Sequence, residues 1–228
     1  MIAPLLRRLS TGGLAVAGPA VAALAVVGLA MVLSGCAGQT EAPARLYALH
    51  PIATADAVAV PQRTRRSPWI GIHRVVVPGY VDRPEVVTRG PGNALVVDPK
   101  ERWAESLPIG LTRLLLDNLS VLLGSDQVIL LPEPSGLPVD LEVMVDLTQF
   151  ELDGLGSAVL AGRWTVTSAR TLRDVQSAAF DLHEPIVPEG YEAGVAALNR
   201  SVSAVSRDIA LAIGRVGAGT RGRVGRSR

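Results

Sequence analysis

Histidine and cysteine, two common catalytic and metal-binding types, are scarce in this 228-residue sequence, which has three histidines and one cysteine. The three histidines, His50, His73 and His183, lie far apart, and none has a second ligand at metal-site spacing. The chain lacks the GxSxG, P-loop and HExxH patterns. Residues 217–222 match GxGxxG, but they follow a helical pattern instead of a strand, so the phosphate-binding context is missing. The sequence therefore predicts a protein that is not an enzyme, with no metal and no cofactor.

Three carboxylates share one predicted strand, residues 139–149. Asp140, Glu142 and Asp146 fall on the outward positions of an alternating apolar run. This is typical of a solvated strand face, although acids two residues apart could also contact a partner. An active site dispersed along the chain stays an alternative.

The only cysteine, Cys36, follows the uncharged apolar residues 14–33. Arg7 and Arg8 precede them, so the N-terminus has the charged region, the apolar region and the small residues of an export signal. A transmembrane helix, which needs about 20 apolar residues, is the competing interpretation. The residues just before the cysteine favour export.

Those residues are Leu33, Ser34 and Gly35, which with Cys36 resemble the bacterial lipobox. In a lipobox the small residues fit the signal peptidase, and the cysteine thiol takes the lipid. We expect removal of residues 1–35 and acylation of Cys36. Several acyl chains anchor a protein stably, since each buried CH₂ contributes about 0.8 kcal/mol.

The exported part is nearly neutral. Without residues 1–35, Lys+Arg falls from 22 to 20 while Asp+Glu stays at 21, because only Arg7 and Arg8 are lost. This balance argues against a nucleic-acid partner. Residues 217–228 are arginine- and glycine-rich and are expected to form a flexible basic tail, with attraction to anionic lipid as the alternative.

Two helices are predicted. The first spans 107–123, with Ser106 as its cap, Pro108 near its first turn, Gly124 at its end and leucines three or four residues apart. The second spans about 189–216, and its apolar residues are also three or four apart. That spacing fits packing on a sheet, and a coiled-coil seam is the alternative.

Apolar runs between turn signals predict the strands. They lie at 45–51, 69–80, 84–99 (a hairpin), 126–132, 139–149, 160–168 and 176–186, with a loop at 53–68. After a lipidated tether at 36–44, we expect one α+β domain over 45–216. Its mostly antiparallel or mixed sheet would carry both helices on one side.

One region has polar and aromatic residues that a core does not need. It contains Tyr80-Val81-Asp82-Arg83-Pro84, then Thr88-Arg89, then Arg102-Trp103-Ala104-Glu105. Together with Tyr47-Ala48-Leu49, these motifs resemble the ABC-type transport auxiliary lipoprotein family, to which paraquat-inducible protein C belongs. The resemblance spans about residues 33–213. The loop at 53–68 and the basic tail depart from the family's pattern.

The resemblance implies a non-catalytic, periplasm-facing lipoprotein subunit of a lipid transport system that helps maintain envelope integrity. Its partners would be an envelope-spanning protein with mammalian-cell-entry (MCE) domains and the associated inner-membrane components. Ala37, where a sorting rule would look for Asp, favours the outer membrane. Self-association stays open. A structural envelope lipoprotein is the second interpretation, and a hydrolase is a distant third.

The expected partner-binding residues are Tyr80, Asp82, Arg83, Arg89, Arg102 and Trp103. They flank a turn and the approach to a helix, which are surface positions where binding residues concentrate. Tyr, Trp and Arg are also the types that dominate interfaces. The alternative is that Asp82–Arg83 and Arg102–Trp103 only brace the loop against the sheet.

Overall fold

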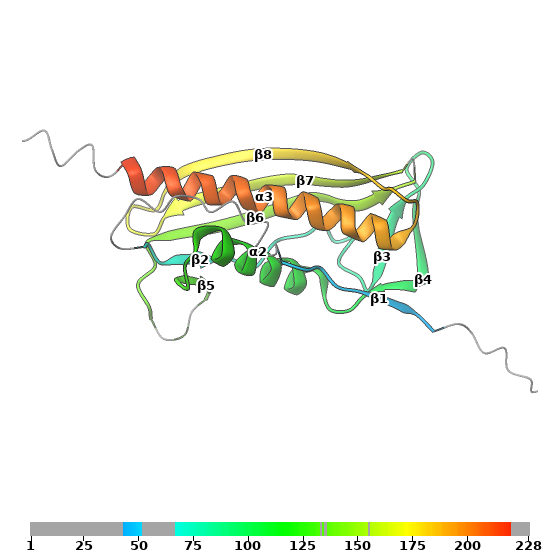
Figure 1. Ribbon diagram of the computed structural model, residues 1–228, viewed down its shortest axis with the longest axis horizontal. Helices are drawn as coiled ribbons and strands as arrows, with labels where there is room; N and C mark the ends of the chain where they lie inside the picture. The colour runs from blue at the N-terminus through cyan, green and yellow to red at the C-terminus, as the bar shows by residue number, and fades with distance from the viewer. Residues whose placement is uncertain (1–42, 52–66, 133, 135, 155, 220–228) are drawn as a thin grey trace, which may run out of the picture. The chain divides into compact units, whose positions relative to one another are not determined.

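The computed structural model describes residues 43–51, 67–132, 134, 136–154 and 156–219 (Figure 1). The predicted signal peptide, Cys36, most of the 53–68 loop and residues 220–228 lie outside the described residues. The elements in chain order are β1 (Arg45–Tyr47), β2 (Ile70–Ile72), β3 (Glu85–Arg89), β4 (Leu95–Trp103), α2 (Leu107–Leu123), β5 (Val128–Leu130), β6 (Leu141–Asp153), β7 (Ser157–Ser168), β8 (Arg173–Pro185) and α3 (Tyr191–Gly219).

The strands form one eight-stranded mixed sheet built around β6. On one side, β7 pairs antiparallel with β6, and β8 pairs antiparallel with β7. On its other side, β6 pairs in parallel with β2 at Leu141–Val143 and with β3 at Leu152–Asp153. The short strands β2 and β3 therefore follow one another along the same edge of β6, and the segment between them contacts β6 through a parallel bridge between Val76 and Asp146.

The remaining strands extend these two short ones. β5 pairs in parallel with β2, β4 pairs antiparallel with β3, and β1 pairs in parallel with β4. Both helices pack on one face of the sheet, where α3 contacts β6, β7 and β8, and α2 contacts α3 and β5 (Figure 1). The prediction of one α+β domain with two helices is confirmed.

Helix α2 has the predicted bounds, but its start differs from the prediction in one respect. Ser106 occupies the N-cap position, yet its side chain makes no capping hydrogen bond. The start is specified instead by Pro108, whose ring fixes a helical φ in the first turn. Gly124 ends the helix at φ 56°, in the left-handed region that glycine adopts most easily. The predicted leucines face the core and are buried: Leu107, Leu111, Leu114, Leu115, Leu119 and Leu122.

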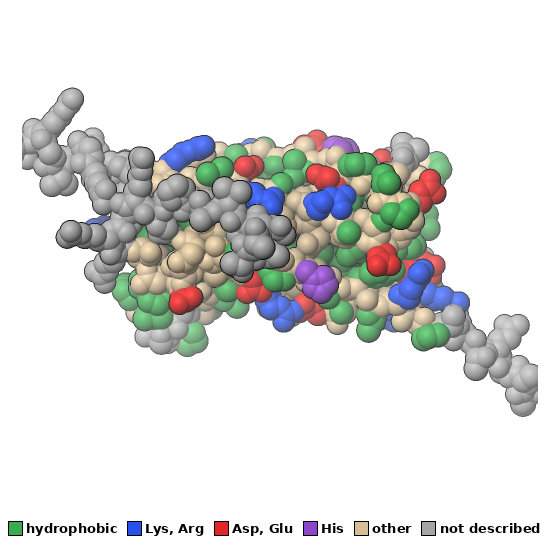
Figure 2. Space-filling view, viewed as in Figure 1, with side chains coloured by type: hydrophobic (Ala, Val, Ile, Leu, Met, Phe, Trp, Pro, Cys, Tyr) green, Lys and Arg blue, Asp and Glu red, His purple; other side chains and the backbone are tan. Residues whose placement is uncertain are grey.

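Helix α3 buries its predicted stripe against the sheet and α2, including Val195, Leu198, Val202, Val205, Ile209 and Ala212. This is sheet packing, as the sequence predicted. None of the helices in the described part of the chain combines the length and hydropathy needed to span a bilayer. On the face seen in Figure 2, basic and acidic side chains lie interspersed, in agreement with the near-neutral sequence.

Several strands differ in extent from the prediction. The strand predicted at 139–149 spans Leu141–Asp153. A bulge between Leu147 and Gln149 shifts the alternation of buried and exposed side chains by one residue, so that Phe150 is buried. The strand predicted at 69–80 ends at Ile72. Its backbone still follows β6, with His73 N–H donating to Val143 O at 3.0 Å.

The predicted 84–99 hairpin is present, and its second strand, β4, continues to Trp103. The register jumps from Val87↔Val97 to Glu85↔Arg102, so Pro99 falls where β4 has no ladder partner in β3. Proline donates no hydrogen bond, and such a gap in the ladder is where a strand tolerates it.

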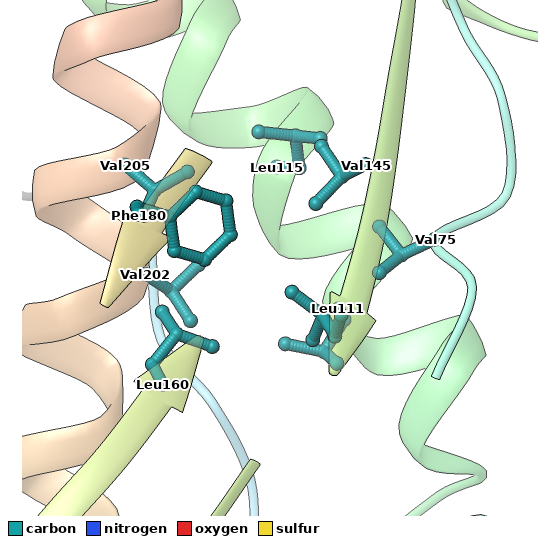
Figure 3. Close-up of a pocket in the computed structure, with 9 residues that line it drawn as sticks. Val75, Leu111, Leu115, Val145, Leu160, Phe180, Val202 and Val205 are labelled. Carbon is teal, nitrogen blue, oxygen red and sulfur yellow. The ribbon is translucent and has the colours of Figure 1, made fainter. Parts of the chain in front are cut away.

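A small apolar cavity lies between the two helices and the sheet (Figure 3). Its lining comes from α2, α3, the three long strands and the segment after β2: Val75, Leu111, Leu115, Val145, Leu147, Leu160, Phe180, Val202 and Val205. The space that the centre of a water molecule could occupy is about 20 Å³, roughly that of one water. The cavity is therefore too small for an acyl chain and is a packing defect.

Filling this cavity is expected to stabilise the domain. Val205→Ile adds one methylene at the cavity wall, and the free energy of unfolding should rise by about 0.5–1 kcal/mol. The matched control is Val195→Ile on the same helix, because Val195 is buried but does not line the cavity. There the extra methylene should stabilise nothing, or destabilise by overpacking. Equal changes in urea midpoint for both variants would contradict this account.

Candidate partner-binding site

Three of the six predicted binding residues line one pocket of about 360 Å³. These are Asp82, Arg83 and Trp103. The rest of the wall is formed by Pro84, Glu105 and Ser106. The pocket therefore combines the turn before β3, the end of β4 and the start of α2, which are segments that the sequence separates by about twenty residues.

Backbone hydrogen bonds fix the pocket's walls. The turn closes where Val81 N–H donates to Pro78 O at 3.0 Å. Trp103 N–H then donates to Pro84 O at 2.7 Å, which joins the end of β4 to the segment that carries Asp82 and Arg83. Because these bonds involve main chain, the relative positions of the walls do not depend on the charged side chains.

Trp103 belongs to the core more than to the surface. Its exposed fraction is 7%, and its ring lies 5.8 Å from that of Phe150 with an interplanar angle of 50°. Such tilted aromatic pairs are favourable beyond their buried area. The small exposed part of Trp103 is what the pocket can present to a partner.

The charged residues of the pocket are paired unevenly. Arg83 Nε donates to Glu85 Oε2 at 2.9 Å, and Glu105 forms an ion pair with Arg113 of α2. Asp82 is exposed and has no hydrogen-bond or ion-pair partner among the described residues. The pocket thus carries one carboxylate whose charge is not locally compensated.

Arg102 lies next to the pocket without lining it. In the ladder it sits opposite Glu85, the same carboxylate that binds Arg83. The guanidinium of Arg102 forms no ion pair within the described part of the chain. The guanidinium of Arg102 is therefore available to a partner at the rim of the pocket.

Tyr80 and Arg89 lie in a different cluster, around the buried carboxylate of Glu151. Arg89 Nε donates to Glu151 Oε1 at 2.5 Å and Arg89 Nη2 to Oε2 at 3.1 Å, while Glu151 is only 1% exposed. Burial, with the neighbouring Glu151 as the second cause, raises the pKa of Tyr80 to about 12. The Tyr80 hydroxyl nevertheless lacks the distance and angle of a hydrogen bond to any described residue. The geometry favours a bracing role for these two residues.

Sequence reasoning missed a second cluster of this kind, around Glu101 of β4. Glu101 is 2% exposed, accepts a hydrogen bond from the Tyr47 hydroxyl at 2.6 Å and pairs with Arg45. Burial, followed by the hydrogen bond to Glu101, raises the pKa of Tyr47 to about 12. The available signal was alternation, because Glu101 shares the inward phase of Trp103 on β4.

The two tyrosines make stability depend on pH in the alkaline range. A tyrosine pKa raised in the folded state means that folding favours the neutral phenol, so the stabilisation is complete below pH 10 and is lost as pH rises through about 12. We expect phenolate absorbance of Tyr47 and Tyr80 to rise about two pH units later than in the unfolded chain. Single Tyr→Phe variants assign each transition, and ionisation of either residue near pH 10 would contradict this.

The other predicted polar residues form no site. Asp140 and Asp146 are exposed, and Glu142 pairs with His73 at 2.8 Å. His183 faces Asp181 on the same strand. Within the described ranges, no group of three or more histidine, cysteine or acidic residues is placed to hold a metal.

Comparison with known proteins identifies the relatives of this chain. Residues 47–210 match the family described as ABC-type transport auxiliary lipoprotein component. A search of curated proteins found no match. A crystal structure of a Xanthomonas campestris protein of the DUF330 family has a TM-score of 0.61 and 18% identity, covering 77% of this chain and 99% of that one.

A second crystal structure, of an uncharacterized protein, has a TM-score of 0.59 and 22% identity, covering 74% of this chain and 97% of that one. At these identities the two likenesses show a shared fold. The family match covers more than two thirds of the sequence and includes all three motifs that the sequence analysis identified between residues 80 and 105. The chain belongs to the ABC-type transport auxiliary lipoprotein component family, whose description makes it an envelope-associated lipoprotein in a transport-related role.

Proposed function

We propose that this protein is a lipid-anchored, non-catalytic subunit of an MCE-type lipid transport system and that it acts by binding partner proteins. Family membership supports the transport role. The single observation that carries the binding role is the pocket, where Asp82, Arg83 and Trp103 from separate segments meet at the surface. The partner is an envelope-spanning MCE-domain protein together with inner-membrane components.

The anchor is the acylated thiol of Cys36. After residues 1–35 are removed, eight residues separate Cys36 from Arg45 at the start of β1. That tether reaches at most about 30 Å, since an extended chain spans roughly 3.3–3.6 Å per residue. The protein therefore stays close to one membrane. We propose that this is the outer membrane, with the domain on its periplasmic side. Mass spectrometry of membrane-extracted protein is expected to find an acylated N-terminal cysteine, and an intact Met1 would contradict the anchor.

The partner claim is tested by affinity purification. Full-length tagged protein, extracted from envelopes in mild detergent, is expected to recover an MCE-domain protein in stoichiometric amounts. The matched control is a Cys36→Ala variant, which keeps the domain and removes the proposed lipid attachment. Recovery of other envelope complexes without any MCE-domain protein would favour the second interpretation, a structural lipoprotein without a transport role.

A further inference from the structure

We infer that the pocket beside Trp103 receives a positively charged side chain, an arginine or a lysine, from the partner protein. This inference rests on the proposed function, because it names the chemistry of the partner at the same surface. Three observations carry it: the uncompensated charge of Asp82, the position of Glu105 and the composition of the walls.

Among the described residues that line the pocket, the internal ion pairs leave one negative charge uncompensated. Arg83 is neutralised by Glu85, and Glu105 by Arg113. Asp82 remains as the lining charge with no partner among the described residues. A cation entering the pocket would therefore find a carboxylate that loses no existing ion pair on binding. Within the described part of the chain, the only cation in the lining, Arg83, is already paired with Glu85, and the unpaired Arg102 lies next to the pocket without lining it.

The start of α2 does not offer an alternative anion site. Helix N-termini attract negative charge, and no acidic residue lies in the first turn of α2. Glu105 fills that role from just before the helix, since it packs so closely over the first turn that a Cβ on residue 110 would lie 3.2 Å from Glu105 Oε1. Gly110 thus leaves room for this carboxylate, and a partner carboxylate would be repelled by Asp82.

The walls suit the stem of a long basic side chain. Pro84 and Trp103 supply apolar surface, and Asp82 supplies the charge that the head group needs. Arginine and lysine bury their methylene stems against apolar surface and keep the charged end in water. The volume of about 360 Å³ falls in the range of about 300–1,000 Å³ found for ligand pockets.

The test uses blocked arginine, N-acetyl-arginine methylamide, as the probe and blocked citrulline as its neutral isostere. Full-length protein in detergent micelles is titrated, and binding is followed by the ¹⁵N-indole signal of Trp103, which is assigned with a Trp103→Phe variant. We expect a saturable shift with blocked arginine and at least tenfold weaker binding of blocked citrulline. Asp82→Asn should weaken arginine binding about tenfold, while Asp126→Asn, an exposed carboxylate beyond α2, should leave it unchanged.

Equal binding of arginine and citrulline would overturn the inference, as would an Asp82→Asn protein that binds arginine like wild type. Saturable binding of blocked aspartate instead would indicate an acidic partner and would also overturn it. Circular dichroism of Asp82→Asn checks that the variant is folded. Because the titration contains no MCE-domain protein, its failure leaves the purification result unaffected, and the two claims fail separately.

Discussion

Replacing Trp103 by alanine is expected to destabilise the domain by about 3–5 kcal/mol, the usual cost of removing a large aromatic side chain from a core. Trp103 is 7% exposed and packs on Phe150, so truncation leaves a cavity beneath the pocket. For a domain of this size the melting temperature should fall by roughly 10 °C. Thermal unfolding followed by circular dichroism measures the change.

Trp103→Phe is the matched control, because it keeps an aromatic ring against Phe150 and should lose much less. A Trp103→Ala protein that melts within about 2 °C of wild type would contradict the assignment of this residue to the core. This destabilisation also complicates binding experiments, because a Trp103→Ala protein could lose its partner by unfolding instead of by losing a contact. Trp103 is therefore a poor residue for mapping the interface by truncation.

Replacing Arg89 by alanine is expected to cost about 2 kcal/mol. Removing one partner of a fully buried ion pair typically costs about 3–5 kcal/mol, because the other charge stays buried without compensation. Glu151 is 1% exposed, but a third of the Arg89 side chain (33%) reaches solvent, so water replaces part of the lost interaction. Urea unfolding of the variant measures the change in free energy.

The double variant Arg89→Ala/Glu151→Gln separates this explanation from simple loss of packing. Neutralising Glu151 removes the buried charge that Arg89 compensates, so the double variant should recover part of the stability lost by Arg89→Ala. If the two residues do not interact, their effects on the free energy of unfolding are additive. The double variant would then be less stable than Arg89→Ala by the amount that Glu151→Gln costs in the wild-type protein. In that case Arg89 would return to the set of candidate binding residues.

Periodicity predicted both helices with nearly correct bounds, with start and end signals fixing those of α2. The leucines of α2 and the apolar stripe of α3 repeat every three or four residues, and such local spacing needs no knowledge of what the helix packs against. Gly124 likewise ends α2 through its own backbone preference. These features are properties of neighbouring residues, which is why sequence reasoning reached them.

The sheet depends on contacts that sequence spacing does not reveal. That β2 and β3 share one edge of β6 follows from registers across about seventy residues. The bulge after Leu147 shifts the inward-facing positions by one residue, so strict alternation from Val139 could not anticipate the burial of Phe150. The buried pairing of Glu151 with Arg89, 62 residues apart, is a product of that register.

The sequence predicted six candidate binding residues, and the fold places them in two separate clusters. The motifs pointed to six residues, and local turn chemistry placed Asp82 and Arg83 at the surface. Which of the six share a pocket depends on where β4 and α2 return beside the turn. The fold brings Trp103 to Asp82 and turns Tyr80 and Arg89 towards Glu151.

The central claim, that the protein binds its partner through the pocket beside the turn, is tested most directly by Asp82→Ala. Asp82 is exposed and has no ion-pair partner among the described residues, so its removal should change the melting temperature by less than about 2 °C. Full-length wild type, Asp82→Ala and an exposed control beyond α2, Asp126→Ala, are purified from envelopes in parallel. The account predicts at least a tenfold loss of co-purified MCE-domain protein for Asp82→Ala alone. Undiminished recovery with a folded Asp82→Ala protein would place the binding surface elsewhere.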